Sequence, residues 1–353
     1  MPPSPTSMSS AASIPHPSPS EPFVSVRGLT KHFVVERDVV GKPKSLLAAV
    51  DGVDLDINRG EVLGLVGESG SGKSTLARLI LRLLPATSGS VLFEGRDVLT
   101  ASQKELRDFR RHAQIIFQDP FGSLDPRMKV SSIVEEGMGH LGLSKAERRK
   151  RVAELLSLVH LPARAVDRYA HEFSGGQRQR ISIARALAVN PTFLIADEPV
   201  SALDVSVQSH ILNLLQELRE QLSLTYLFVT HDMSVVNHLA DRVAVMYLGK
   251  LVEIAPVDEL FDNPRHPYTQ ALLSSVPSLT RTGIDRRIIL EGDIPTAVDP
   301  VAACRFAGRC FRVQDRCRNH VPELEKVPVA RDHFVACFNP ASFAEVADEL
   351  RAR

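Results

Sequence analysis

The sequence predicts an α/β fold built on a mostly parallel β-sheet with helices on both faces, and three observations support this. Short apolar runs typical of buried parallel strands occur at residues 62–66, 193–196 and 226–229. Segments with the spacing of amphipathic helices separate these runs. Each run is followed by glycines or by polar residues that could carry chemistry. Strands and helices that alternate in this way form parallel sheets.

The first expected elements are strands. Residues 23–27 alternate as in an edge strand, and residues 48–57 form a second strand that ends at a turn. The strand at residues 62–66 leads into a glycine-rich loop and then a helix. Residues 102–111 and 144–160 are expected to form exposed, highly charged helices. The apolar face of the helix after the glycine-rich loop is expected to hold Leu76, Leu79, Ile80 and Leu83.

Composition and charge disfavour some classes of protein. The chain has 353 residues, enough for one large domain with an appendage, and Lys+Arg and Asp+Glu both number 42. A nucleic-acid-binding protein usually has a basic excess, so no nucleic-acid partner is expected. No run approaches the roughly 20 apolar residues that span a bilayer. Any role at a membrane would therefore depend on docking to a partner.

The N-terminal residues 1–22 form a leader rich in Pro and Ser that lacks the apolar run of a signal peptide. This segment has too little apolar surface to offset the entropy of ordering, so we expect it to be disordered. The absence of a signal places the chain in the cytosol.

A phosphate-binding loop is predicted at residues 67–74, which fit the pattern G-x4-G-K-[ST] between a strand and a helix. Glycines let backbone N–H groups approach phosphate oxygens closely, and the helix directs its positive end at the same anion. Lys73 should reach the outer phosphates, and the Ser74 hydroxyl should bind Mg²⁺. The predicted nucleotide-binding residues of this loop are Gly67, Ser69, Gly70, Ser71, Gly72, Lys73, Ser74 and Thr75.

An acidic pair, Asp197 and Glu198, follows the apolar run at residues 193–196. Ligands of open α/β sheets lie at the carboxyl ends of the strands, so the pair should face the phosphates. We expect Asp197 to hold Mg²⁺ through water. Glu198 is the candidate to polarise the attacking water, because phosphoryl transfer depends mainly on positioning and charge.

A second glycine-rich string, Phe173-Ser174-Gly175-Gly176-Gln177, lies shortly before the acidic pair. A serine at a helix start followed by two glycines makes a second anion-binding end. This string resembles the signature motif of ATP-binding cassette (ABC) proteins, and further motifs of that family occur in the expected order. Gln118 resembles the glutamine that senses Mg²⁺ and faces the membrane subunits, Asp204 lies in a segment similar to the D-loop, and His231 resembles the switch histidine that contacts the γ-phosphate.

The resemblance to ABC proteins implies a fold and a mechanism. The implied fold is an ABC-type P-loop NTPase core at residues 23–260, with an antiparallel β subdomain and a helical subdomain at about residues 118–175. Two such domains would face each other head to tail, and each ATP would lie between one chain's phosphate loop and the other's serine-glycine turn. Phe33 takes the place of the aromatic that stacks on adenine, with a core position in an ordinary strand as the alternative.

The family motifs assign roles to individual residues. The implied catalytic residues are Glu198, His231, Gln118 and Lys73. The implied Mg²⁺ ligands are Ser74, Gln118 and Asp197. The implied nucleotide contacts outside the phosphate loop come from Phe33, Gln118, Ser174, Gly175, Gly176, Gln177, Asp197 and Asp204.

Residues 266–273, which lie outside the catalytic core, resemble a segment of oligopeptide and dipeptide importer ATPases. That branch pairs two different ATPase chains beneath two permeases, and an external binding protein delivers the cargo. The resemblance implies a peripheral position at the cytoplasmic face of the inner or plasma membrane, with residues 261–353 as a C-terminal extension. An importer of nickel or another small solute, an exporter subunit and a soluble ATPase acting on nucleic acid are alternatives.

The cysteines of the chain all lie in this extension, at Cys304, Cys310, Cys317 and Cys337. Four thiolates suit zinc or an iron–sulfur cluster equally on composition. The spacing lacks C-x2-C pairs, and this, together with the importer resemblance, favours a [4Fe–4S] cluster. Zn²⁺ and free buried thiols are the alternatives.

Overall fold

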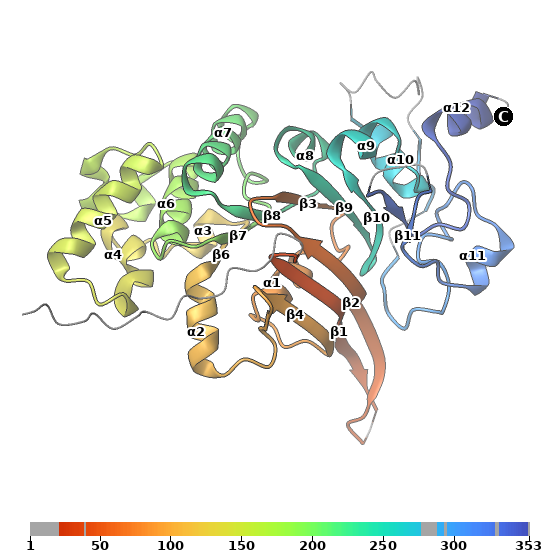
Figure 1. Cartoon of the computed structure of the whole chain (residues 1–353), viewed down its shortest axis with the longest axis horizontal. Helices are drawn as coiled ribbons and strands as arrows, with labels where there is room; N and C mark the ends of the chain where they lie inside the picture. The colour runs from red at the N-terminus through yellow and green to blue at the C-terminus, as the bar shows by residue number, and fades with distance from the viewer. Residues whose placement is uncertain (1–20, 39, 277–287, 293–294, 329–331, 352–353) are drawn as a thin grey trace, which may run out of the picture.

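The fold is known from a computed structural model, in which two β-sheets pack against each other and helices cover the outer face of the larger one (Figure 1). All but the last two residues of the predicted leader lie outside the described part of the chain. The described residues are 21–38, 40–276, 288–292, 295–328 and 332–351.

The larger sheet confirms the predicted α/β class. Its strands are β3 (Val62–Val66), β6 (Ala113–Ile116), β7 (Phe193–Asp197), β8 (Thr225–Thr230), β9 (Arg242–Tyr247), β10 (Lys250–Pro256), β11 (Glu325–Lys326) and β12 (Phe334–Val335). They lie in the order β11-β12-β10-β9-β3-β8-β7-β6. The strands from β9 to β6 are parallel, and β10, β12 and β11 continue the sheet antiparallel. The three apolar runs seen in the sequence are central parallel strands, buried on both faces.

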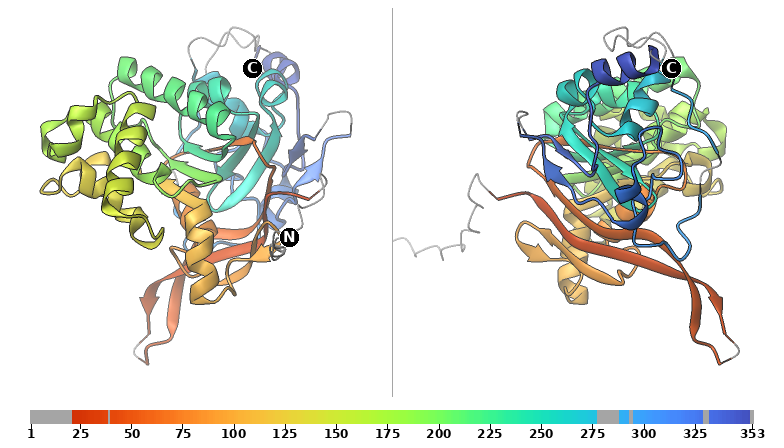
Figure 2. Two further views of the ribbon diagram at one scale, coloured as in Figure 1. Left: turned by 60° about the vertical axis from the view of Figure 1, so that its left-hand side comes forward. Right: turned by 90° about the vertical axis from the view of Figure 1, so that its right-hand side faces the viewer.

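The smaller sheet is antiparallel. Its strands are β1 (Val24–Arg37), β2 (Pro43–Ile57), β4 (Ser88–Phe93) and β5 (Arg96–Asp97), in the order β2-β1-β4-β5. The prediction that the first strand lies at an edge is wrong, because β1 pairs with β2 on one side and β4 on the other. Both faces are covered at the start of the strand, where Phe23 and Ser25 are buried as well as Val24 and Val26. The ends of β1 and β2 form a hairpin that projects from the body (Figure 2).

Helix α1 (Lys73–Ile80) lies between the two sheets (Figure 1). Leu76 and Leu79 are fully buried in a core shared with both sheets, as their spacing predicts. The prediction that Leu83 belongs to this face is wrong, because the helix ends before Leu83 and 43% of the surface of this residue is exposed. The opposite face of the larger sheet is covered by α7 (Val205–Leu222) and α8 (Met233–Leu239).

The region between β6 and β7 is mostly helical and forms one end of the molecule (Figure 1). It contains α3 (Pro120–Ser123), α4 (Val130–Glu135), η1 (Glu136–His140), α5 (Lys145–Leu158), η2 (Ala163–Asp167), η3 (Ala170–Glu172) and α6 (Gly175–Leu187). The charged helix predicted at residues 144–160 is α5, which begins at a capping box made by Ser144 and Glu147. The one predicted at 102–111 is α2 (Gln103–His112).

The C-terminal extension packs beside β10, at the opposite end from the helical region (Figure 2). Helix α9 (Val257–Asp262) leads into it, and its own helices are α10 (Pro267–Ser274), α11 (Asp315–Asn319) and α12 (Phe343–Arg351). The fully buried carboxylate of Glu253 on β10 joins this extension to the sheet. It accepts hydrogen bonds from the backbone N–H groups of Arg265 (2.6 Å) and His266 (3.1 Å), and His333 Nε2 lies 2.7 Å away.

We predict that Glu253→Ala destabilises the fold by about 3–5 kcal/mol, because it leaves a buried histidine, one buried N–H group and one partly buried N–H group without this acceptor. Urea denaturation would give the loss, and hydrogen exchange in α10 and β12 would localise it. Glu259→Ala is the matched control: it removes a 3.4 Å contact of a partly exposed carboxylate with His333 Nδ1 and a 3.5 Å hydrogen bond from Asn263, and should cost less than about 1 kcal/mol. Equal losses in the two variants would contradict the anchoring role of Glu253.

Candidate functional site

The phosphate loop connects β3 to α1, and its glycines are required by close backbone approaches. A Cβ atom at Gly67 would lie 2.1 Å from Met246 O, and one at Gly72 would lie 2.1 Å from Ala49 O. Gly72 also has φ +107°, in the region that favours glycine. It is the N-cap of α1 and makes no side-chain cap. The first N–H groups of α1 are therefore not capped by a side chain, which suits them to bind an anion.

Lys73 is nearly completely buried beneath the loop, 4% exposed. Its ammonium group donates to Gly67 O at 2.7 Å and to Glu68 O at 2.9 Å. Burial lowers the pKa of Lys73, and the carboxylates of Glu198, Asp197 and Glu68 oppose that shift. A buried cation surrounded by loop carbonyls is placed to exchange these partners for phosphate oxygens.

Ser74 and Asp197, both predicted Mg²⁺ ligands, lie together. The Ser74 hydroxyl donates to Asp197 Oδ1 at 2.8 Å. Burial raises the pKa of Asp197, and the hydrogen bond from Ser74 together with the charges of Arg78 and Lys73 opposes the shift. A nearly buried carboxylate beside a hydroxyl provides two hard oxygen ligands of the kind that Mg²⁺ binds in phosphate sites.

Three of the predicted site residues, Glu198, Gln118 and His231, lie together. Gln118 Nε2 donates to Glu198 Oε2 at 3.0 Å, and His231 Nδ1 lies 3.4 Å from the same oxygen. The three side chains come from the ends of β6, β7 and β8, which meet because these strands are parallel neighbours. Glu198 also has φ +47°, a left-handed conformation that costs a non-glycine residue free energy. Such conformations occur frequently at functional sites.

The serine-glycine turn lies apart from this cluster. Ser174 is the N-cap of α6, where it forms a capping box with Gln177, and its side chain is exposed. Asp204 is the exposed N-cap of α7. Within the described residues, no hydrogen bond or ion pair joins either turn to the phosphate loop of the same chain. The phosphate loop of one chain is therefore not capped by the serine-glycine turn of that same chain.

Phe33 lies on β1 with 36% of its surface exposed, and the Lys31 ammonium lies 5.0 Å from the ring centroid. Phe33 is therefore not part of the hydrophobic core, so the alternative of a buried position in an ordinary strand does not hold. An exposed aromatic face is what stacking on a base requires.

The phosphate loop also contacts the C-terminal extension, through residues that sequence reasoning missed. The Glu68 N–H donates to Tyr268 Oη on α10 at 2.8 Å. The Glu68 carboxylate pairs with Arg309, with Nη1–Oε2 at 2.7 Å and Nη2–Oε1 at 3.3 Å. Tyr268 lies in the segment 266–273 that resembles a family motif, but no local pattern in that segment indicates a chemical role.

The four cysteines lie near one another, and each of Cys304, Cys310 and Cys337 is affected by the charge of its neighbours. Burial raises the pKa of Cys310 to about 11 and that of Cys337 to about 12. The Cys304 N–H donates to Cys317 O at 2.9 Å. Among the described residues, no group of three or more His, Cys, Asp or Glu side chains is arranged to hold a metal ion.

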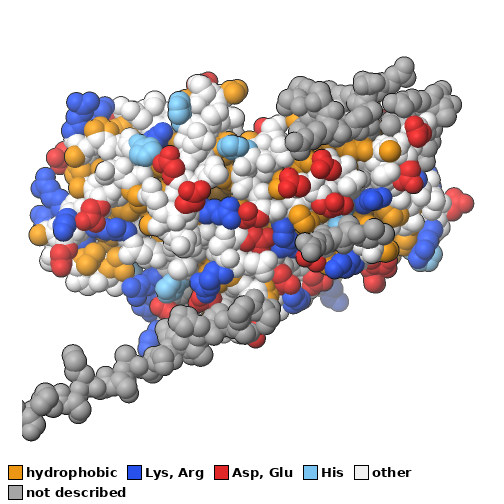
Figure 3. Space-filling model, turned by 45° about the horizontal axis from the view of Figure 1, so that its top comes forward, with side chains coloured by type: hydrophobic (Ala, Val, Ile, Leu, Met, Phe, Trp, Pro, Cys, Tyr) orange, Lys and Arg blue, Asp and Glu red, His pale blue; other side chains and the backbone are white. Residues whose placement is uncertain are grey.

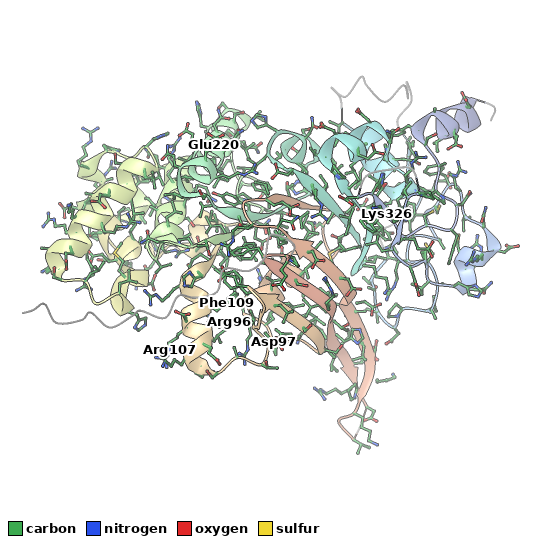
Figure 4. The ribbon with its side chains drawn as sticks, viewed as in Figure 1. Arg96, Asp97, Arg107, Phe109, Glu220 and Lys326 are labelled. Carbon is green, nitrogen blue, oxygen red and sulfur yellow. The ribbon has the colours of Figure 1, made fainter. Side chains whose placement is uncertain are left out.

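A groove of about 940 Å³ lies between the smaller sheet and the helical region. It is lined by the end of β4, β5, α2 and η1, with both acidic and basic side chains. Figure 4 labels four of its residues, Arg96, Asp97, Arg107 and Phe109. Helix α2 leads directly into β6, which ends two residues before Gln118. The groove is thus connected to the Glu198 cluster by one continuous segment.

Comparison with known proteins matches the chain to two family models. Residues 50–201 match "ABC transporter", and residues 252–317 match "Oligopeptide/dipeptide transporter, C-terminal region". A putative peptide import ATP-binding protein of Brucella ovis is 50% identical over 317 residues, 90% of this chain and 97% of that protein. The oligopeptide transport ATP-binding protein AppF of Bacillus subtilis is 48% identical, with the same coverage of each chain.

Solved structures are also similar. An ATP-binding cassette solved as a dimer in a post-hydrolysis state with ADP and Pi aligns with a TM-score of 0.59 and 32% identity, over 66% of this chain and 98% of that one. The protein cbiO1 of Clostridium perfringens, part of an ABC transporter complex, aligns with a TM-score of 0.59 and 31% identity, over 69% of this chain and 91% of that one.

Proposed function

This chain belongs to the ATP-binding subunits of ABC transporters, and from that premise we propose that it powers the import of peptides by hydrolysing ATP. The observation that carries the proposal is the convergence of Gln118 and His231 on Glu198, beside the buried Lys73. The relatives that match nearly the whole chain are named for peptide, oligopeptide or dipeptide transport, which supports peptides as the cargo.

The proposed chemistry assigns one task to each part of the site. Lys73 and the first N–H groups of α1 bind the outer phosphates, while Ser74 and Asp197 hold Mg²⁺, which neutralises phosphate charge when bound. Glu198 orients and polarises a water molecule. The water oxygen bonds to the γ-phosphorus as the bond from that phosphorus to the ADP oxygen breaks, and one proton of the water passes to the Glu198 carboxylate, giving ADP and phosphate. Gln118 fixes the position of the Glu198 carboxylate.

Because the serine-glycine turn does not reach the phosphate loop of its own chain, we infer that a second ATPase subunit completes the site. Ser174 at the start of α6 is exposed and makes no contact with its own chain's phosphate loop among the described residues. We propose that this turn caps the ATP held by a homologous partner subunit, and that the partner's turn caps the ATP held here. ATP then favours the closed dimer through contacts that the open dimer lacks, and hydrolysis removes them.

Replacement of Glu198 by Gln should retain ATP binding within about threefold but lower turnover by at least about 100-fold, because the amide cannot polarise the water as a carboxylate does. The variant should also accumulate ATP-bound dimers. Lys73→Ala should lose ATP binding itself, since it removes the buried cation. Phosphate release and nucleotide binding by the complex with its partner subunits would measure both effects.

Lys145→Ala, which changes an exposed lysine at the start of α5, serves as the control and should behave as the wild type. Undiminished phosphate release by Glu198→Gln would remove Glu198 from its assigned role. ATP binding that survives Lys73→Ala would overturn the proposed function as a whole.

The membrane partners are proposed to be two permease subunits, with an external binding protein that delivers the cargo to them. No helix in the described part of the chain combines the length and hydropathy needed to cross a bilayer. We place the chain at the cytoplasmic face of the inner or plasma membrane. On the face shown in Figure 3, acidic and basic side chains are interspersed, with no single basic stripe of the kind that nucleic acid would favour.

The groove between α2 and η1 is the proposed docking site for a cytoplasmic helix of a permease. Its volume of about 940 Å³ suits the end of a helix, and its mixed charges suit a polar partner. The segment from α2 through β6 to Gln118 links the groove to Glu198. Movement of a docked helix would therefore act on the residue that positions the catalytic carboxylate.

The double variant Arg107→Glu/His140→Glu should weaken association with the permeases by about tenfold, because it reverses or adds charge on two sides of the groove. Co-purification of the complex from detergent would measure the loss, and nucleotide binding by the isolated subunit would confirm that the variant is folded. Lys145→Glu, a charge reversal outside the groove, should leave association unchanged. Normal assembly of the double variant would rule out this docking site.

The four cysteines are proposed to hold a [4Fe–4S] cluster, with Zn²⁺ as the alternative. The support is the chemistry of the donors: four thiols lie within electrostatic reach of one another, although the described side chains are not arranged around a metal position. Burial raises the pKa of Cys304, Cys310 and Cys337, so a bound cation would be needed to stabilise their thiolates. Arg305 and Arg309 lie between Cys304 and Cys310, and the Nε groups of both are buried without an acceptor. Such donors favour a bound group with net negative charge. Both a [4Fe–4S] cluster and a Zn²⁺ ion would form such a group when bound by four thiolates.

Protein purified without oxygen should contain iron and acid-labile sulfide and absorb visible light. Cys310→Ser should lose most of both, because it removes one of four ligands, while the nucleotide affinity reports whether the fold persists. Stoichiometric zinc in a colourless preparation would establish the alternative. A colourless, metal-free and folded preparation would leave the cysteines as structural thiols.

A further inference from the structure

The second residue of the phosphate loop, Glu68, is held from outside the catalytic core. Its carboxylate is paired through both oxygens with Arg309, and its N–H donates to Tyr268 Oη. The side chains of Glu68 and Arg309 are 21% and 9% exposed. Both partners belong to the C-terminal extension, and neither has a role in the ATP hydrolysis proposed above.

The extension fixes these two groups through an aromatic cluster. Tyr268 is fully buried and packs on Tyr247 of β9, with ring centroids 4.7 Å apart, and on Phe306, at 5.5 Å. Phe306 in turn meets Tyr247 edge to face at 5.2 Å. Arg309 Nη1 lies 3.5 Å from Tyr247 Oη. Tyr268 and Arg309 therefore approach Glu68 from a rigid platform rather than from a solvated surface.

The charge of Glu68 matters to phosphate binding. Glu68 is near enough to Lys73 to favour its charged form, and the Glu68 carbonyl accepts a hydrogen bond from that ammonium group. An unpaired carboxylate at this position would repel the phosphates that Lys73 attracts. The bidentate pair with Arg309 cancels that repulsion and also fixes the loop backbone at Glu68.

We propose that Arg309 and Tyr268 are positioning residues through which the C-terminal extension sets the affinity of the phosphate loop for ATP. Arg309 neutralises Glu68, and Tyr268 holds the Glu68 N–H. This inference rests on the proposed function as an ATPase. A purely structural role for the two contacts would affect folding stability but leave the affinity for ATP unchanged.

The test measures binding of a non-hydrolysable MgATP analogue to the full-length chain by calorimetry. Arg309→Gln should raise the Kd about tenfold, equivalent to about 1.4 kcal/mol, because it leaves the carboxylate unpaired. Arg309→Lys should stay within about threefold of the wild type. The double variant Glu68→Gln/Arg309→Gln should recover most of the affinity, since no unpaired charge remains. Tyr268→Phe should raise the Kd about threefold.

Arg305→Gln is the matched control. Arg305 lies in the same segment, is equally buried, and pairs with Asp51 instead of the phosphate loop. It should lower thermal stability as much as Arg309→Gln does but leave the Kd unchanged. In the assembled transporter, Arg309→Gln should raise KM for ATP while kcat stays within about twofold.

The binding measurements distinguish a failure of this inference from a failure of the proposed ATPase function. A wild-type chain that binds no nucleotide would overturn both. Wild-type binding with an unchanged Kd in Arg309→Gln would overturn the inference alone. A raised Kd in Arg309→Gln that the double variant fails to recover would overturn the role of charge neutralisation.

Discussion

The parallel pairing of β3, β8, β7 and β6 is the constraint on which the site depends. Parallel strands end at the same edge of the sheet, so the phosphate loop, Asp197, Glu198, His231 and Gln118 are delivered to one place by four separate segments of the chain. No side chain needs to reach far. The strands themselves are apolar and buried, which makes their ends rigid supports for polar groups.

The charges at this edge are balanced against one another. Lys73 loses solvation on burial, and three carboxylates compensate for it. Asp197 loses solvation as well and is compensated by Ser74 and by nearby cations. Phosphates and Mg²⁺ would enter a site whose positive and negative groups already face each other, so binding would exchange partners instead of creating isolated buried charges.

Several polar contacts join the C-terminal extension to the core, among them the pair between Arg305 and Asp51, and two further ones bear on burial and on the phosphate loop. One is the buried Glu253, which receives N–H groups from the start of the extension and faces His333 near its end. The other is the phosphate loop, where Tyr268 and Arg309 meet Glu68. A segment that touches the loop proposed to bind ATP is placed to influence that binding, which a domain without such contacts would not be.

The sequence by itself determined the α/β class, the central strands and the identity of the phosphate loop, because these depend on local patterns: apolar runs, glycine spacing and polar residues at strand ends. It also indicated that Asp197 and Glu198 should face the phosphates, since ligands of open α/β sheets lie at the carboxyl ends of the strands. Only the tertiary structure decided what depends on distant pairing. The second neighbour of β1 is one example, and the left-handed backbone of Glu198 is another. The pair between Glu68 and Arg309 joins residues 241 positions apart, and no local pattern records which of the chain's arginines will neutralise that carboxylate.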